Sequence, residues 1–518
     1  MKRLYATAAI AAMLLSCTKG EPAPESNPSQ EDVPAAPELG YEVSPTGRNV
    51  YTDTEIRLEF DSAPQLGNSG AIRIFTSDGD EVDCIMMEDV IAEKTTMDNN
   101  TIYNTAMDIL EASPGSTKYY RTVHYTAVRI EGNSVVIKPH CSVLNFNTEY
   151  YITIDPEAIE APGFEGVEKE EWAFLTKVKP ASETEVSVGK SGNTDFRTVQ
   201  GALDYTCRSG QSAAVTINIQ NGSYDEPLFL CNKDNVTLKG MSRSGVILQY
   251  SNCEALTSGV GSSTDRKPSR GNAIGRSGGR AVILMEDCDN IRFENMTLQN
   301  TWSGERSQAE VIYFNSRTGE DRLVLVNCNI GSRQDTINAK GYGWFYNCSI
   351  EGNVDFIWGS PETILFEKCD IRTISDEGFS RGYIVQCRCL EADAIGFVFL
   401  GCTINSDSGV PDGSVYLARS SGSSDYYDNV TYAGCRIGPA VAASGWYSDP
   451  APNPSSPSAT RGWKEYGTTD MSGSSADLSG RYGGSLQLSE TEYSEHFKDR
   501  SVIFSGCPKG TDWLAETI

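Results

Sequence analysis

Histidine is nearly absent from this sequence of 518 residues, which contains only His124, His140 and His496. None of the three lies between residues 141 and 495. A zinc site built from several histidines is therefore excluded from that stretch, and a Ser-His-Asp arrangement would have to use His496. Chemistry in the second half of the chain must depend on carboxylates, amides and arginines.

Basic residues are scarce relative to acidic ones. The chain has 43 lysines and arginines against 70 aspartates and glutamates, a formal net charge of −27. Nucleic acids select basic surfaces, so we expect no nucleic-acid partner. One basic stretch, residues 266–280, contains Arg270, Arg276 and Arg280. We hypothesise that it lines a groove for a polyanion; the alternative is a solvated loop.

Long apolar runs are missing after the N-terminus, so no segment has the roughly 20 apolar residues of a membrane-spanning helix. The start of the chain has a basic end and an apolar run to Leu15, typical of a secretory signal, and residues 14–17 resemble a lipobox. We expect residues 1–17 to contain a lipoprotein signal peptide with its lipobox, and Cys17 to be lipidated after cleavage. Residues 18–40, rich in Pro, Glu and Ser, predict a disordered tether. The protein would then be exported and lipid-anchored in the cell envelope, as an outer-membrane lipoprotein facing the periplasm or the surface.

The sequence has no Cys-x-x-Cys pair, although it has 15 cysteines. Export would favour disulfides, but five of the cysteines recur beside apolar residues at one position of a repeat. This placement predicts an interior ladder of small, buried and mostly free thiols. Cys387 and Cys389 are too isolated to predict a metal site, and we expect no metal. The five ladder positions are Cys328, Cys348, Cys369, Cys402 and Cys435.

These cysteines belong to a repeated tract of short apolar strands bounded by Gly, Asn or Ser. Its period of 20 to 33 residues is typical of a solenoid, here a parallel β-helix in which each coil buries its inner face against its neighbours. We place this domain at residues 185–518, with a helix over 195–203 capping its first coil. The repeated tracts are Val326–Ile330, Tyr346–Ile350, Glu367–Ile371, Leu400–Ile404 and Ala433–Ile437.

The repeat also brings two acids together. Asp335 and Asp355 each follow a ladder cysteine by seven residues, and adjacent coils lie about 4.8 Å apart. Two carboxylates that close cannot both ionise freely, so one becomes an acid and the other a base. The alternative is that such acids are solvated or cap backbone amides. Asp376 has the same spacing, but its polar surroundings favour a loop.

Residues 41–178 differ from the solenoid. Polar and apolar residues alternate over 55–60, 71–74 and 150–154, as in half-buried antiparallel strands. The segment closes on Trp172–Thr176 and resembles bacterial Ig-like sandwich domains, although its irregular middle, about 88–125, departs from that pattern. We interpret it as a spacer; a carbohydrate-contacting module is the alternative.

Six motifs, in order, resemble the pectin methylesterases over nearly all of residues 185–518. Any one would be a weak signal, but the ordered set is specific. The resemblance implies a right-handed parallel β-helix, which agrees with the repeat. The motifs are Gly222–Glu226, Gln308–Glu310, Gln334–Thr336, Asp355–Gly359, Leu417–Arg419 and Gly445–Trp446.

The resemblance also implies roles for five residues. Asp355 would attack the methyl ester carbonyl of galacturonate in pectin, and Arg419 would keep it ionised. Asp335 would donate a proton to the leaving methanol and then activate water. Gln308 and Gln334 would donate hydrogen bonds to the oxyanion. No cofactor is implied.

Substrate binding is where this chain departs from the family. Ser420 and Ser421 stand where the family has Pro-Trp, which removes an aromatic wall. Glu310 replaces an apolar residue, and Trp358 replaces a phenylalanine. We expect an altered preference for methylation pattern or chain length. The predicted substrate-binding residues are Tyr224, Trp358, Trp446, Arg270 and Arg276.

Other functions remain open from the residues alone. A polygalacturonase cleaves glycosidic bonds with acids only, but its clustered Asp and His motifs are missing. A pectate lyase needs an acid-rich calcium site, and none is visible. A catalytically silent pectin-binding lipoprotein would have no reason to keep both aspartates, both glutamines and Arg419. We expect pectin as the partner, membrane contact only through the lipid anchor, and a monomer.

Overall fold

The computed structural model describes residues 40–91, 105–111, 118–123, 127–140, 142–257, 262–263 and 278–515. The predicted signal peptide, the lipidation site Cys17 and nearly all of the tether lie outside these residues, as do Arg270 and Arg276. No helix within the described ranges is long and apolar enough to cross a membrane.

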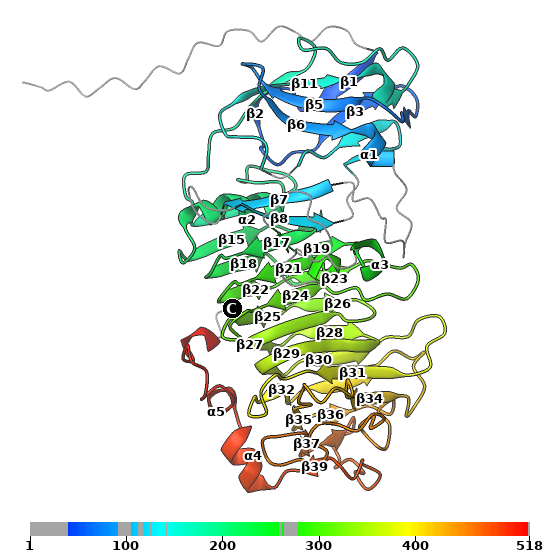
Figure 1. Ribbon diagram of the computed structural model, residues 1–518, viewed down its shortest axis with the longest axis vertical. Helices are drawn as coiled ribbons and strands as arrows, with labels where there is room; N and C mark the ends of the chain where they lie inside the picture. Colours follow the sequence, from blue (N-terminus) through cyan, green and yellow to red (C-terminus); the bar gives the residue numbers. More distant parts are fainter. Residues whose placement is uncertain are drawn as a thin grey trace, which may run out of the picture. The chain divides into compact units, whose positions relative to one another are not determined.

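Two antiparallel-rich sheets form the first part of the described chain (Figure 1). The predicted strands over 55–60, 71–74 and 150–154 are present, and their buried residues belong to one core. The likeness to Ig-like domains stays a prediction. One sheet orders β1 (Tyr41–Ser44), β3 (Ile56–Phe60), β10 (Ser134–Ile137) and β9 (Val128–Glu131); the other orders β2 (Gly47–Val50), β13 (Ala173–Thr176), β11 (Glu149–Ile154), β5 (Ala71–Thr76) and β6 (Glu81–Met86).

From β14 (Glu185–Val188) onward, parallel strands stack coil upon coil (Figure 1), which confirms the predicted parallel β-helix. The first stack continues through β15 (Val215–Ile219), β18 (Val236–Gly240), β22 (Ile291–Glu294), β25 (Arg322–Val326), β27 (Ile337–Tyr346), β29 (Val354–Glu367), β32 (Gly396–Leu400), β35 (Val430–Ala433), β37 (Trp463–Tyr466) and β39 (Leu486–Gln487). The long strands β27 and β29 also join a second stack, made by β17 (Leu228–Cys231), β21 (Ile283–Glu286), β24 (Ile312–Asn315), β31 (Gly382–Cys387) and β34 (Val415–Ala418).

A separate nine-stranded sheet forms the remaining stack of the coils. Its register pairs Asn329 with Ser349 and then Ser349 with Asp370, so each strand repeats the position of the one before it. The strands are β16 (Gly222–Asp225), β19 (Val246–Tyr250), β23 (Thr297–Asn300), β26 (Asn329–Gly331), β28 (Ser349–Gly352), β30 (Asp370–Thr373), β33 (Thr403–Ser406), β36 (Arg436–Ile437) and β38 (Thr469–Asp470).

The cysteine ladder lies at the turn that leads into this sheet. All five ladder cysteines are buried and free, as predicted. Each follows a residue with positive φ, for example Asn327 at 54° and Asn347 at 53°. Asparagine tolerates this left-handed conformation better than most residues. The thiol of Cys348 donates to the carbonyl of Leu325 on the preceding coil at 3.5 Å, so the ladder helps to fix the register between coils.

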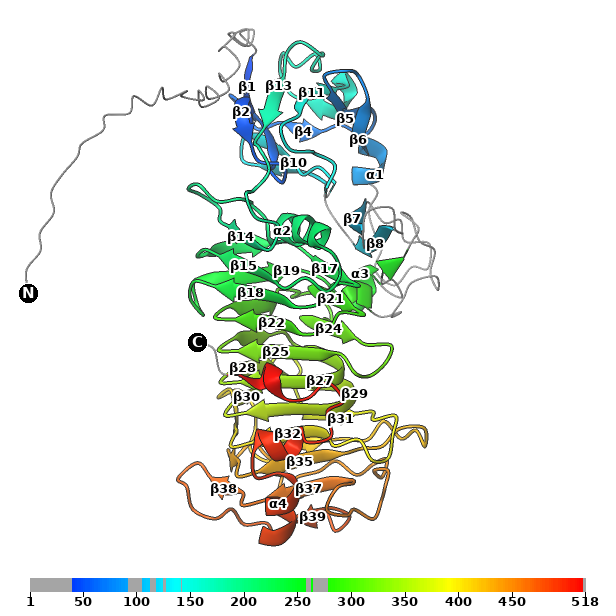
Figure 2. The ribbon, with the colours of Figure 1, turned by 90° about the vertical axis from the view of Figure 1, so that its left-hand side faces the viewer.

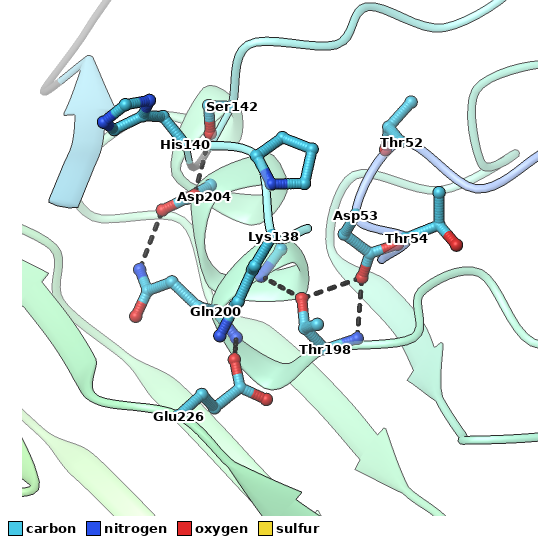
Figure 3. Close-up of a pocket in the computed structure, with 12 residues that line it drawn as sticks. Thr52, Asp53, Thr54, Lys138, His140, Ser142, Thr198, Gln200, Asp204 and Glu226 are labelled. Atoms are coloured by element: carbon cyan, nitrogen blue, oxygen red, sulfur yellow. Dashed lines mark hydrogen bonds between the residues drawn. The ribbon is translucent and has the colours of Figure 1, made fainter. Parts of the chain in front are cut away.

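A helix closes the first coil. The predicted cap over 195–203 is observed as α2 (Val199–Thr206), with Thr198 as its N-cap. The carboxylate of Asp53, in the turn between β2 and β3, accepts a hydrogen bond from the amide of Thr198 at 2.7 Å (Figure 3) and another from the amide of Arg197 at 2.8 Å. Burial raises the pKa of Asp53 to about 6, while these hydrogen bonds oppose the shift. Asp53 therefore links the N-terminal part of the chain to the helix that caps the β-helix, and its role is structural.

The irregular middle of the N-terminal part reaches the β-helix. Strands β7 (Thr105–Glu111) and β8 (Lys118–Val123) pair, and β8 also pairs with β20 (Ser262–Ser263). The guanidinium of Arg121, which is fully buried, donates to the carbonyls of Leu228 and Val282 at 2.6 and 3.1 Å. Strands β7 and β8 therefore belong to a sheet with β20 and not to the two N-terminal sheets.

The C-terminal segment packs along the side of the β-helix, as Figure 2 shows in red. It contains α4 (Glu490–His496) and α5 (Arg500–Ile503). Its buried residues Phe497, Phe504 and Trp513 share a core with Trp344 and Leu365 from the coils. This segment covers the outer face of the first stack.

Candidate active site

The two predicted acids occupy corresponding positions on adjacent coils. Ile337 of β27 pairs with Ile357 of β29, an offset of 20 residues that also relates Asp335 to Asp355. The backbone amide of Asp335 donates to the carbonyl of Val354 at 3.1 Å. Both side chains are buried, with 6% and 5% exposure. The stacking inferred from the repeat is therefore present in the structure.

Both aspartates adopt a backbone conformation that is uncommon for residues other than glycine. Their φ angles are +64° for Asp335 and +47° for Asp355. A residue other than glycine keeps this left-handed conformation where the surrounding structure holds it. Asp335 lies just before β27 and Asp355 lies at the start of β29; the two strands pair with each other and with neighbours on both sides. The rigid coils therefore fix both carboxylates.

Asp355 pairs with an arginine that has no other acidic partner among the described residues. Arg419 donates from Nε to Asp355 Oδ1 at 2.7 Å and from Nη2 to Oδ2, a forked pair. The Nε2 of Gln386 donates to the same Oδ2 at 3.1 Å, and Arg388 Nε holds the Gln386 carbonyl at 2.8 Å. Burial raises the pKa of Asp355, while Arg419 and then Arg388 oppose that shift. These contacts favour an ionised, oriented carboxylate.

Asp335 has a different environment. The nearest cation is Arg280, whose Nη2 lies 3.5 Å from Asp335 Oδ2. Burial raises the pKa of Asp335 well above its usual range, and the charges of Glu310 and Asp355 raise it further. Arg280 and a hydrogen bond from Gln334 oppose this shift only in part. These surroundings favour the protonated form of Asp335, which a general acid requires.

The two predicted amide donors stack on neighbouring coils. Gln308 pairs with Gln334, and Gln334 pairs with Val354, through isolated parallel bridges. Both glutamines are half-buried; Gln334 directly precedes Asp335 in the chain, and Gln308 lies beside Gln334 on the neighbouring coil. This column places neutral donors next to Asp335 and Asp355, where negative charge on a bound carbonyl oxygen would be stabilised.

Trp358 is the one predicted substrate-binding aromatic that lies near the acids and is partly exposed. Its ring is half-buried, with the guanidinium carbons of Arg388 and Arg280 at 4.9 and 5.7 Å from the ring centroid. The indole Nε1 is buried without a hydrogen-bond partner. Gly359 follows with φ of +136°, and a Cβ there would lie 2.2 Å from the Ala339 carbonyl oxygen. Trp358 is thus held where the two coils approach closely.

Two other predicted substrate contacts are corrected by the structure. Tyr224 is fully buried, and its hydroxyl donates to the carbonyl of Gln220 at 2.8 Å. Trp446 is 1% exposed and stacks on Trp463 with ring centroids 5.2 Å apart. A buried ring cannot stack on a sugar, so both residues pack the core. An aromatic residue in a motif does not reveal which side of the coil it occupies.

The hypothesis for the basic stretch is corrected at Arg280. This residue is 5% exposed and pairs with Glu310, so it does not line an open groove for a polyanion. Arg270 and Arg276 lie outside the described residues. Of the two serines at the missing aromatic wall, Ser420 is buried and donates to Asp428 at 2.8 Å.

Sequence reasoning missed several residues at the site. Gln386 and Arg388 have no motif that marks them, and only the stacking of β31 beside β29 brings them to Asp355. Tyr383, on the same strand, lies 4.4 Å below the guanidinium of Arg419. Across the described ranges, no group of three His, Cys, Asp or Glu side chains is arranged to hold a metal ion.

Comparisons with known proteins agree with this arrangement. The family model described as Pectinesterase matches residues 185–498. Pectinesterase 31 of Arabidopsis thaliana is 30% identical over 237 residues, covering 45% of this chain and 68% of that protein. Pectinesterase QRT1 of the same plant is 26% identical over 340 residues, covering 64% and 78%.

Solved structures are similar as well. The pectin methylesterase from Aspergillus niger has 21% identity and a TM-score of 0.49, covering 66% of this chain and 99% of its own. The pectin methylesterase from carrot has 20% identity and a TM-score of 0.49, with coverage of 64% and 96%. Because the family model spans more than half of the chain, this protein belongs to the pectinesterase family.

Proposed function

We propose that this protein hydrolyses the methyl esters of galacturonate residues in pectin, with Asp355 as nucleophile and Asp335 as general acid and base. One observation carries the assignment. Two buried aspartates lie in register on adjacent coils, and only Asp355 pairs directly with Arg419, an arginine with no other acidic partner among the described residues. Pairs of carboxyl groups whose pKa values are pushed apart are typical of acid and base roles.

In the first step, the Asp355 carboxylate forms a bond to the ester carbonyl carbon. Negative charge moves to the carbonyl oxygen, where the amides of Gln308 and Gln334 donate hydrogen bonds. The bond from carbon to the methoxy oxygen then breaks, and Asp335 gives its proton to that oxygen. Methanol leaves, and the galacturonate acyl group stays on Asp355 as an anhydride.

In the second step, Asp335 is a carboxylate and accepts a proton from water. The resulting hydroxide oxygen bonds to the acyl carbon, and the bond to Asp355 breaks. Galacturonic acid is released and loses its proton to solvent, Asp355 returns to its ionised form, and Asp335 again carries a proton. The cycle consumes one ester and one water, with protons balanced between the two aspartates.

We further propose that the protein is exported and that it acts on homogalacturonan as a lipid-anchored monomer of the cell envelope. The N-terminal run and the lipobox ending at Cys17 support export and lipidation. Labelled palmitate incorporation into the full-length chain, lost in Cys17→Ala, tests the anchor. An unlabelled native chain in the membrane fraction would contradict it.

Methanol release from highly methylated homogalacturonan tests the reaction. The purified chain without its signal is assayed for methanol, for new reducing ends and for unsaturated ends together. We expect methanol alone, at a rate that depends on Asp355. New chain ends would indicate glycosidase or lyase chemistry, and retained polymer binding without methanol would indicate a silent binder.

A further inference from the structure

A buried ion pair lies directly behind the general acid. Nε of Arg280 donates to both carboxylate oxygens of Glu310 at 2.8 and 2.7 Å, and Nη2 lies 2.7 Å from Oε1. The Arg280 side chain is 6% exposed and that of Glu310 is fully buried. The same Nη2 faces Asp335 Oδ2 at 3.5 Å. Arg280 ends a short 3-10 helix (Gly278–Arg280), and Glu310 precedes β24, so separate segments build this contact.

Stability alone gives no reason for this pair. Removing two charges from water is costly, and packed apolar residues of similar size usually stabilise a core equally well. An apolar residue is also what the family resemblance implies at position 310. A charged pair placed 3.5 Å from the acid therefore points to a function at that acid.

The effect of the pair is clear from the charges that face Asp335. These are Arg280, Glu310, Asp355 and Arg419. A lone Arg280 would hold Asp335 ionised, as Arg419 holds Asp355, and the site would then have two bases and no acid. Glu310 neutralises Arg280, so its guanidinium can orient the Asp335 carboxyl without removing the proton.

We infer that Arg280 and Glu310 are positioning residues that act as a unit: Glu310 cancels the charge of Arg280, and Arg280 holds Asp335 in place as a protonated acid. This inference rests on the proposed function and adds two residues to it. Glu254, whose Oε2 lies 3.1 Å from Arg280 Nη1, contributes in the same direction but is more exposed.

The pH dependence of kcat/KM for methanol release tests the inference. Activity requires protonated Asp335, so the alkaline limb of the profile reports its pKa. Glu310→Gln removes the closest negative charge on Arg280 and leaves it only the more exposed Glu254 besides Asp335, which lowers the pKa of Asp335. The alkaline limb is expected to move to lower pH by about 1 to 2 units. Arg280→Gln is expected to move it to higher pH, because Glu310 then faces Asp335 alone.

A second variant keeps the test decisive if either single variant fails to fold. The double variant Arg280→Gln with Glu310→Gln removes both charges of the pair. Its alkaline limb is expected to return toward the native position, while kcat falls by about 10- to 100-fold because the carboxyl is no longer oriented.

Glu465→Gln is the matched control. Glu465 pairs with Arg481 at 2.8 Å, with the same side-chain exposures of 0% and 6%, but on β37 and away from the acids. Its loss is expected to lower Tm and to leave the pH profile unchanged. A slower Glu310→Gln enzyme with an unmoved limb, or a double variant with native rate and profile, would overturn the inference. A native protein that releases no methanol would instead contradict the proposed function.

Discussion

Asp355 and Asp335 occupy the same position on neighbouring coils, share a left-handed backbone and are equally buried, yet their surroundings differ in one respect. Each carboxyl group faces an arginine. The arginine beside Asp355 has no acidic partner other than Asp355 among the ion pairs of the described residues, whereas the arginine beside Asp335 is paired with Glu310. The comparison shows that a repeat can bring two identical side chains together, while their neighbours decide which one is the acid.

The largest effect is expected from removing the nucleophile. Asp355→Asn keeps the shape of the side chain but not the charge, so methanol release should fall by about 10⁴-fold or more. Asp376→Asn is the matched control, because Asp376 has the same spacing from its ladder cysteine but lies in a loop, bound to Arg306 and Asn353. Equal losses of methanol release in both variants would contradict the role of Asp355 as the nucleophile.

Arg419→Gln should have the next largest effect. Asp355 must be ionised to attack, and Arg419 lowers its pKa, so removing the guanidinium raises that pKa. The acid limb of kcat/KM is expected to move to higher pH by about 1 to 3 units, with a lower plateau. An acid limb that stays in place would mean that Arg419 contributes geometry but not charge.

Gln386→Met sharpens the comparison on the Asp355 side. The substitution removes the amide that donates to Oδ2 and keeps a side chain of similar length. One hydrogen bond to a charged group contributes about 1.5 to 3 kcal/mol, so kcat/KM should fall by roughly 10- to 150-fold. The measurement is kcat/KM on methylated oligomers. An unchanged value would show that Arg419 alone orients Asp355.

Asp53 is a half-buried acid outside the site, and its replacement should have the smallest effect on activity. Asp53→Ala leaves the amides of Arg197 and Thr198 without this acceptor, so unfolding should become easier by about 1 to 2 kcal/mol while kcat stays close to native. Thermal unfolding and methanol release, measured on the same sample, check both parts. A large loss of kcat with native Tm would contradict a structural role.

The contribution of Asp53 to the stability of the fold depends on pH in a definite direction. Burial raises the folded-state pKa of Asp53 to about 6, above its ordinary value of 3.8. The folded state therefore binds the proton more tightly, so this residue stabilises the fold most below pH 4 and loses that contribution as the pH rises through 6. Asp53→Ala should remove that part of the pH dependence of Tm.

The stacking of the two acids could be predicted because the repeat carries its own register. The offset of 20 residues is visible in the chain, and the ladder cysteines mark the corresponding positions on each coil. The parallel β-helix and the free buried thiols followed from the same tract. The repeat in the local sequence could predict these features because each contact joins a residue to the corresponding position on the neighbouring coil.

The environment of each acid could not be predicted in the same way. Gln386 reaches Asp355 from the next coil, and Arg280 reaches Glu310 across 30 residues. Local composition suggested a solvated basic loop for Arg280, whereas burial against an acid decides its role. The prediction that Tyr224 and Trp446 bind substrate was wrong for a related reason, since a motif does not distinguish the interior of a coil from its surface.

The protonation of the two acids is the central claim, and difference infrared spectroscopy at neutral pH tests it most directly. Native protein is compared with Asp335→Asn and with Asp355→Asn, and the carbonyl stretch of a protonated carboxyl group is recorded. The account predicts that this band is lost in Asp335→Asn and retained in Asp355→Asn. A band that disappears with Asp355, or that does not change in Asp335→Asn, would contradict the assignment of acid and nucleophile.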